Sequence, residues 1–344
     1  MRRCAIAGAL LVLVSHSAWA SGYSNLNTGI AAMNERRDID ALQYLGDAIA
    51  APDLPPSFLP VAYIDRADTY LRTGNLSAAA ADCDVSVKLR PDWFDSLELC
   101  GVIHLHQNDD VTAIADLTAA VAARPDLAGG YFVLADAYDD KSDLDDALAN
   151  DAKGIALVPD SPEGYSDRAR IYELQGRYDL ALADRKTALD QDDDNSDLVR
   201  ALGITQWALG QFDDAESSFR HALRGDPSSP YSVIWVDIGA AALDPDKKPD
   251  PPSASDVDLT TWPAPVLSYF QGTTALKDVM TAAAQGTAAV QKNQLCEANF
   301  YTAEWLTLHK SPDPVRPLLE DAVRNCPRDY IEFVAATVEL RRLK

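Results

Sequence analysis

Cysteines, two closely spaced histidines and a run of aspartates are the residues of this chain whose chemistry could define a site. His104 and His106 lie two positions apart, so on a helix they face different directions and cannot share one metal ion. The run DQDDDNSD at 190–197 begins like a calcium-binding loop. However, Asn195 stands where that loop needs glycine, and Ala201 stands where it needs its closing glutamate. We interpret the run as an acidic turn.

Motifs of catalysis are also missing. The sequence contains no H-E-x-x-H, no phosphate-binding glycine loop and no G-x-S-x-G. Serines flank a histidine only in Ser15-His16-Ser17, inside the apolar N-terminal segment. We therefore predict a binding protein and not an enzyme, with no cofactor and no metal site.

The first twenty residues predict export. The pair Arg2-Arg3 precedes an apolar run at 4–14, and the segment ends in Ala18-Trp19-Ala20. This order is typical of a secretory signal peptide, and the apolar run is shorter than a membrane span. We expect cleavage near Ala20, no lipid anchor, no membrane insertion, and a soluble periplasmic or secreted product.

Composition limits the partners. The chain has 30 Lys and Arg against 53 Asp and Glu, a net charge of −23. Such a chain repels phosphate backbones and anionic lipid, so nucleic acid is excluded as a partner and basic protein surfaces are favoured. After export, the four cysteines of the mature chain lie in an oxidising compartment, where disulfides form in any of three pairings.

The elements that position these residues follow a repeat of 34 residues. Five alanines mark the period, and twelve residues before each stands another small residue. Apolar and small residues recur at helical spacing on both sides of a turn signal, which predicts a helix, a tight turn and a second helix in each unit. The alanines are Ala79, Ala113, Ala147, Ala181 and Ala215, and the preceding small residues are Ala67, Gly101, Ala135, Ala169 and Gly203.

These columns resemble the tetratricopeptide repeat family. The segments YIDRADTYLRTGNLSAAAADCDVSVKLRP and YSDRARIYELQGRYDLALADRKTALDQD carry the resemblance, which covers about six repeats in residues 21–229. It implies an all-α fold, a right-handed superhelical solenoid of helix-turn-helix repeats with a divergent C-terminal hairpin. The first helices of the repeats would line a concave binding surface.

The resemblance also implies which side chains line that groove. They are mostly acidic, with some arginines and aromatic rings, which suits a peptide with basic and apolar side chains. The predicted residues are Asp68, Arg72, Glu98, His106, Phe132, Asp136, Asp139, Arg170, Glu173, Arg200 and Trp207.

Beyond the repeats, we expect an additional packing helix at 230–243, a linker rich in Pro and Asp at 244–257, and C-terminal helices at 258–344. On the repeat template, 296–327 is a divergent hairpin. Cys296 would begin its first helix and Cys326 would end its second, so a disulfide would join the two ends. Cys83 and Cys100 fall in core columns, either bonded or as two free thiols.

A second resemblance concerns the tail. The segments PYSVIWVDIGAAALD, WPAPVLSYFQG, EANFYTAEW and RDYIEFVAATVELRRL are similar to the tail of NlpI-type periplasmic repeat proteins. It implies a homodimeric adaptor that presents peptidoglycan hydrolases to a C-terminal processing protease, and exposed Trp and Phe would support the dimer. The alternative is a component of an envelope assembly or secretion complex, and a hydrolase would need a site that the sequence does not show.

Overall fold

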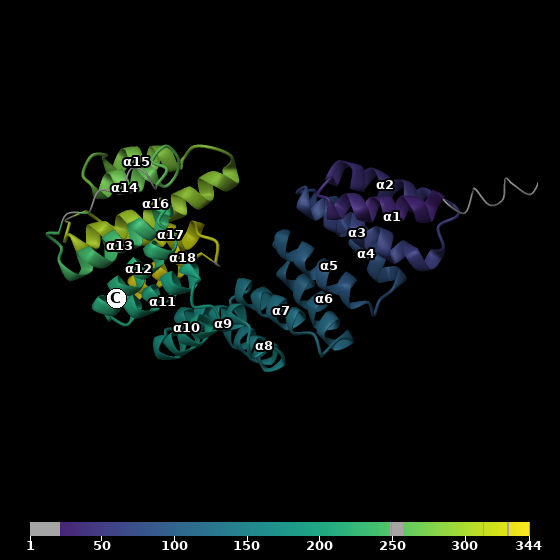
Figure 1. The fold of residues 1–344 in the computed structure, drawn as a ribbon, viewed down its shortest axis with the longest axis horizontal. Coiled ribbons are helices and arrows are strands. Elements are labelled where there is room, and N and C mark those ends of the chain that lie inside the picture. Colours follow the sequence, from purple (N-terminus) through teal and green to yellow (C-terminus); the bar gives the residue numbers. More distant parts are fainter. Residues whose placement is uncertain (1–20, 248, 250–256, 312, 329, 344) are drawn as a thin grey trace, which may run out of the picture. The chain divides into compact units, whose positions relative to one another are not determined.

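The computed structural model describes residues 21–247, 249, 257–311, 313–328 and 330–343. The predicted signal peptide at 1–20 and most of the predicted linker at 244–257 lie outside these residues. The described residues form 18 α-helices and one short 3-10 helix and contain no strand, which confirms the all-α prediction (Figure 1). The chain divides into two compact units, an N-terminal unit that ends at Leu157 and a C-terminal unit that begins at Val158.

The N-terminal unit consists of four antiparallel helix pairs. Each helix packs against its partner across a short turn, and the second helix of each pair packs against the first helix of the next. A 3-10 helix at Pro56–Phe58 lies in the longer connection between the first two pairs. The pairs are α1 (Ser21–Asn34) with α2 (Asp38–Ala50), α3 (Leu59–Arg72) with α4 (Leu76–Leu89), α5 (Phe94–His106) with α6 (Asp110–Ala123), and α7 (Ala128–Asp140) with α8 (Leu144–Leu157).

Small residues let the two helices of a pair approach closely. A Cβ atom added at Gly101 in α5 would lie only 2.4 Å from Cγ of Leu117 in α6, so this position has no room for a side chain. Ala67 and Cys83 occupy the same two columns of the preceding pair and are fully buried. The turn after α3 needs a left-handed backbone, which Gly74 supplies with φ of 78°.

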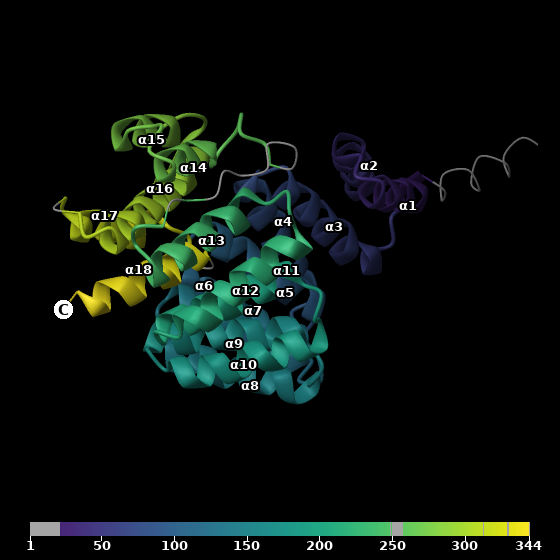
Figure 2. The same cartoon turned by 60° about the vertical axis from the view of Figure 1, so that its left-hand side comes forward.

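The C-terminal unit starts with two further pairs, α9 (Pro162–Gln175) with α10 (Tyr178–Gln191) and α11 (Ser196–Ala208) with α12 (Phe212–Gly225). After α13 the pairing changes, because two short helices lie beside a long one (Figure 2). The remaining helices are α13 (Pro230–Leu243), α14 (Ala264–Phe270), α15 (Leu276–Ala283), α16 (Ala288–Leu308), α17 (Val315–Asn325) and α18 (Ile331–Arg342).

Trp235 of α13 lies at the centre of the C-terminal unit. Its ring is fully buried, and its centroid is 5.2 Å from that of Phe219 in the preceding pair and 5.7 Å from that of Phe300 in α16. Tyr301 lies against it edge-on at 6.0 Å. Aromatic burial therefore attaches the long helix α16 to the last repeats.

The hairpin boundaries differ from the prediction. We expected Cys296 to begin the first helix, but α16 begins at Ala288, where the Thr287 side chain accepts a hydrogen bond from the Val290 amide. Cys296 thus lies inside a helix of 21 residues. The repeat template suggested the later start, because it allows only the 13 or 14 residues of an ordinary repeat helix.

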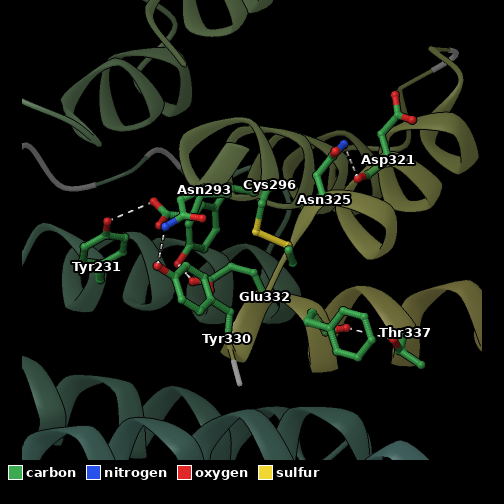
Figure 3. The surroundings of a disulfide bond; sticks show 12 residues. Tyr231, Asn293, Cys296, Asp321, Asn325, Tyr330, Glu332 and Thr337 are labelled. Carbon is green, nitrogen blue, oxygen red and sulfur yellow. Dashed lines mark hydrogen bonds between the residues drawn. A yellow bond between two sulfur atoms is a disulfide. The ribbon is translucent and has the colours of Figure 1, made fainter. Parts of the chain in front are cut away.

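Both cysteine pairs lie at bonding distance. Cys296 and Cys326 have Cα atoms 4.8 Å apart, and this disulfide joins α16 to the residue that follows α17 (Figure 3). Cys83 and Cys100 join α4 to α5 with Cα atoms 5.6 Å apart. Among the described helices, none combines the length and the apolar composition needed to cross a bilayer.

Candidate functional site

The first helices of the N-terminal repeats form a continuous inner layer, because α1 contacts α3, α3 contacts α5 and α5 contacts α7. We call the surface of α3, α5 and α7 in this layer the acidic face. Asp68 exposes 36% of its side chain there. Glu98 is half-buried and reaches α7, since a Cβ atom added at Gly129 would lie 3.6 Å from its carboxylate oxygen. His106 and Asp136 are exposed.

The other predicted residues of this unit are engaged in packing. Arg72 pairs with Asp38 at 2.9 Å and donates a hydrogen bond to the Met33 carbonyl at 3.2 Å, so it joins α3 to the end of α1. Asp139 is buried, with 2% exposed. Phe132 is half-buried and packs against α8, where a Cβ atom added at Gly154 would lie 2.5 Å from its ring.

Asp65 is a further carboxyl group of the acidic face that sequence reasoning missed. Burial, and then the nearby Asp68 carboxylate, raise the pKa of Asp65 to about 6. Burial and Asp95 likewise raise the pKa of Glu98. A carboxyl group with a raised pKa is one whose charge lacks sufficient compensation by water or by a cation.

No described cation faces Asp65, and this has a structural cause. The adjacent Arg66 points to α4, where it donates two hydrogen bonds to Asp82 at 2.6 and 2.7 Å. Arg168 makes the same pair of bonds with Asp184 in the C-terminal unit at 2.7 and 2.8 Å. The segments YIDRADTY and YSDRARIY contain this shared arrangement, and that recurrence was the sequence signal for Asp65.

In the C-terminal unit the inner layer is covered by the chain itself. The last helix, α18, packs against α9 and α11 as well as against α16 and α17. Arg341 donates hydrogen bonds to the carbonyls of Glu173 and Leu174 at the end of α9. Arg342 donates to the carbonyls of Trp207, at 2.7 Å, and Ala208, at 2.8 Å, at the end of α11.

Two of the four predicted groove residues of this unit, Trp207 and Glu173, are therefore buried, and Arg170 and Arg200 are partly buried. Trp207 is only 2% exposed, and the Arg342 guanidinium lies 4.6 Å from its ring centroid. Glu173 is also 2% exposed, and it accepts hydrogen bonds from Arg185 and from the Thr205 hydroxyl.

The two predicted arginines face the segment that leads into α18. Arg170 donates a long hydrogen bond of 3.5 Å to the carbonyl of Arg328. Arg200 pairs with Asp197 at 2.7 Å, and its charge also acts on Glu332 at the start of α18.

Four buried carboxyl groups line the contact between α16 and α18. Burial raises the pKa of each carboxyl group, and the pKa of Glu297 is raised to about 7. Glu297 accepts hydrogen bonds from Tyr231 at 2.9 Å and from the Trp262 indole at 2.6 Å. The four groups are Glu297 and Glu304 of α16 and Glu332 and Glu339 of α18, of which Glu332 is labelled in Figure 3.

Two of these groups differ in how well they are satisfied. Glu332 accepts a hydrogen bond from the Tyr301 hydroxyl, whereas neither carboxyl oxygen of Glu304 has a hydrogen-bond partner among the described residues. Within the same residues, no group of three or more His, Cys, Asp or Glu side chains is arranged to hold a metal ion.

The fold and these surfaces define a helical-repeat protein. Family models described as tetratricopeptide repeat match residues 64–128, 132–196 and 172–232, and none of them describes a catalytic domain. The chain therefore contains tetratricopeptide repeats over these residues. No curated protein matches it.

Solved structures share the fold. The chain is 15% identical to a chain of the APC/C hetero-tetramer Cut9-Hcn1, with a TM-score of 0.52 over 66% of this chain and 44% of that one. It is 20% identical to residues 41 to the end of MamA from Desulfovibrio magneticus RS-1, with a TM-score of 0.46 over 50% and 96% of the two chains. For YrrB, a repeat protein with an unusual peptide-binding site, the identity is 17% and the TM-score 0.43 over 51% and 90%.

Proposed function

We propose that the chain is a protein-binding scaffold whose acidic face binds basic, partly apolar segments of partner proteins. The observation that carries this proposal is the pair of carboxyl groups at Asp65 and Asp68. Among the described residues no cation compensates Asp65, and the one ion pair of Asp68 is a long contact of 3.8 Å with Arg72. The whole unit, counted over residues 21–157, has 23 Asp and Glu against 9 Lys and Arg.

A bound lysine or arginine would relieve this unfavourable arrangement. Above pH 6 the Asp65 carboxyl group is ionised, although it lies close to Asp68 and is partly removed from water. An incoming cation supplies the missing charge and gains a charge-assisted hydrogen bond in a partly buried site. Binding is then expected to weaken as salt rises, because the acidic face also acts at longer range.

A labelled peptide tests the acidic face. We would measure binding of a fluorescein-labelled peptide of alternating lysine and leucine to the mature chain at pH 7.5, with a glutamate–leucine peptide for comparison. The Asp65→Asn, Asp68→Asn variant is expected to bind the lysine peptide about tenfold more weakly, a change of about 1.4 kcal/mol. The matched control replaces Asp84 and Asp92, both exposed outside the acidic face, by Asn. Equal losses in the two variants would refute the proposal.

We further propose that the chain is exported and acts as an adaptor that presents peptidoglycan hydrolases to a C-terminal processing protease. The signal-like segment at 1–20 and the tail motifs support this role. The two disulfides also support it, because disulfides persist in oxidising compartments. The test is mass spectrometry of proteins that co-purify with the tagged mature chain from an envelope extract, at low and high salt.

Recovery of a processing protease with a wall hydrolase at low salt only would support the adaptor. Recovery of assembly or secretion components alone would favour the alternative role in an envelope complex. The homodimer loses one of its two arguments, because none of the described Trp and Phe side chains is exposed. Light scattering tests the dimer that the tail resemblance still implies.

A further inference from the structure

The helix α18 fits the inner layer of the C-terminal unit as a ligand fits a groove. Of its twelve residues, seven are buried: five are apolar, and they lie between two carboxyl groups at Glu332 and Glu339. It contacts the first helices of two successive repeats, α9 and α11, and not merely the end of the array. Inner-layer contact of this kind is the helix-in-groove mode of recognition.

Two consecutive arginines give the contact its specificity. The last carbonyls of a helix have no partner within that helix, and they carry the negative end of its dipole. Arg341 binds such carbonyls at the end of α9 and Arg342 binds them at the end of α11. Because these two helix ends belong to neighbouring repeats, a pair of adjacent arginines matches their spacing, and a single arginine would reach only one of them.

Where α18 faces α16, a buried carboxyl group lacks hydrogen bonds to the described residues. Glu304 of α16 is fully buried, and the nearest charged groups that act on it are Glu339 and Arg342 of α18. Neither oxygen of Glu304 has a hydrogen-bond partner in the described part of the chain. A buried polar group without a partner costs free energy, so the contact between α16 and α18 is weaker than its buried area suggests.

The connection that leads into α18 has a side-chain contact of its own. The helix α18 follows α17 in the chain, after a connection that includes Tyr330. Its connection is held at Tyr330, whose hydroxyl accepts a hydrogen bond from Asn293 at 2.9 Å (Figure 3).

We propose that the inner layer of α9 and α11 is a binding site for a helix with an apolar middle and two consecutive arginines at its end. In this chain α18 occupies that site, and a partner protein that carries such a helix replaces it. The proposal concerns a different surface from the acidic face and does not depend on it. Occupation by the chain's own helix keeps the site closed to weaker ligands.

Peptide binding to the full mature chain tests the proposal. The probe is a fluorescein-labelled peptide of residues 330–343, and the chain variant is Arg341→Ala, Arg342→Ala, in which α18 is a poorer competitor. We expect the peptide to bind this variant at least tenfold more tightly than the wild type. The control, Arg224→Ala, Arg324→Ala, removes two exposed arginines outside the site and is expected to behave as the wild type.

Further measurements decide the remaining outcomes. A peptide in which both arginines are replaced by alanine should lose binding, and binding of both peptides alike would overturn the proposal. Repeating the experiment in the Asp65→Asn, Asp68→Asn background separates the two surfaces, because binding lost there would assign the peptide to the acidic face and overturn the proposal.

Hydrogen exchange covers the case in which no peptide binds. In the Arg341→Ala, Arg342→Ala chain, the amides of α18 should exchange faster than those of α16, as expected for a helix that leaves by itself. Exchange of α18 and α16 together, in one cooperative step, would show that α18 is a fixed part of the core and would overturn the proposal.

Discussion

Replacing Glu297 by Gln is expected to make the C-terminal unit less sensitive to rising pH. Glu297 is 7% exposed, and its carboxylate accepts hydrogen bonds from the Tyr231 hydroxyl and the Trp262 indole. Burial, and then the charge of Glu332, raise its pKa from 4.5 to about 7 despite these two bonds. The carboxyl group of the folded protein therefore prefers to stay protonated.

The sign and size of the effect follow from this pKa. Between pH 4.5 and 7 the folded chain holds a proton on Glu297 that the unfolded chain has lost, so stability is fully present below pH 4.5 and falls as the pH rises to about 7. One unit of pKa is worth about 1.36 kcal/mol, so the loss from this group reaches about 3 kcal/mol. Glutamine keeps an oxygen that accepts both hydrogen bonds but cannot ionise.

Urea unfolding at several pH values between 4.5 and 8, followed by tryptophan fluorescence with both disulfides intact, measures the effect. The free energy of unfolding of Glu297→Gln minus that of the wild type is expected to rise by up to about 3 kcal/mol over this range. Glu320→Gln, at an exposed position of α17, is the matched control and should show no such trend. A difference that stays constant with pH would refute the reasoning.

Two further predictions concern the covalent and steric features of the two units. Replacing Cys296 and Cys326 by Ala opens a loop of 30 residues and should lower the free energy of unfolding by about 3 to 4 kcal/mol. An unchanged thermal midpoint would contradict this. Gly101→Ala places a Cβ atom 2.4 Å from Leu117 and should cost about 1 to 3 kcal/mol by circular dichroism melting. Gly129→Ala, whose new Cβ atom has 3.6 Å of room, should stabilise its helix by about 0.5 to 1 kcal/mol, and equal effects of the two substitutions would refute the packing argument.

Local packing rules account for the parts of the fold that the sequence predicted. A small residue is needed wherever two helices of a pair touch, so Gly101 and the alanines that share its spacing recur every 34 residues. Apolar spacing within each helix follows from the 3.6-residue turn. The small residues and the apolar spacing recur in each repeat, so both can be recognised in a single sequence.

The boundary of α16 could not be found in this way. This helix has 21 residues because it packs against five other helices, α13, α14, α15, α17 and α18. The positions of these contacts follow no fixed period in the sequence. The start at Ala288 depends on the N-terminal cap at Thr287. The prediction followed the repeat template and did not use this local signal.

The candidate surfaces also combine features that the sequence predicts with features that only the tertiary structure shows. The sequence by itself determined the repeat class and the acidic charge, and it predicted Asp68 and Glu98 as groove residues, because these depend on composition and helical spacing. Only the tertiary structure decided that Trp207 is buried under Arg342 and that α18 covers the inner layer of the C-terminal unit. These contacts join residues 134 or more positions apart, and no local rule of spacing determines which distant helix will cover an apolar face.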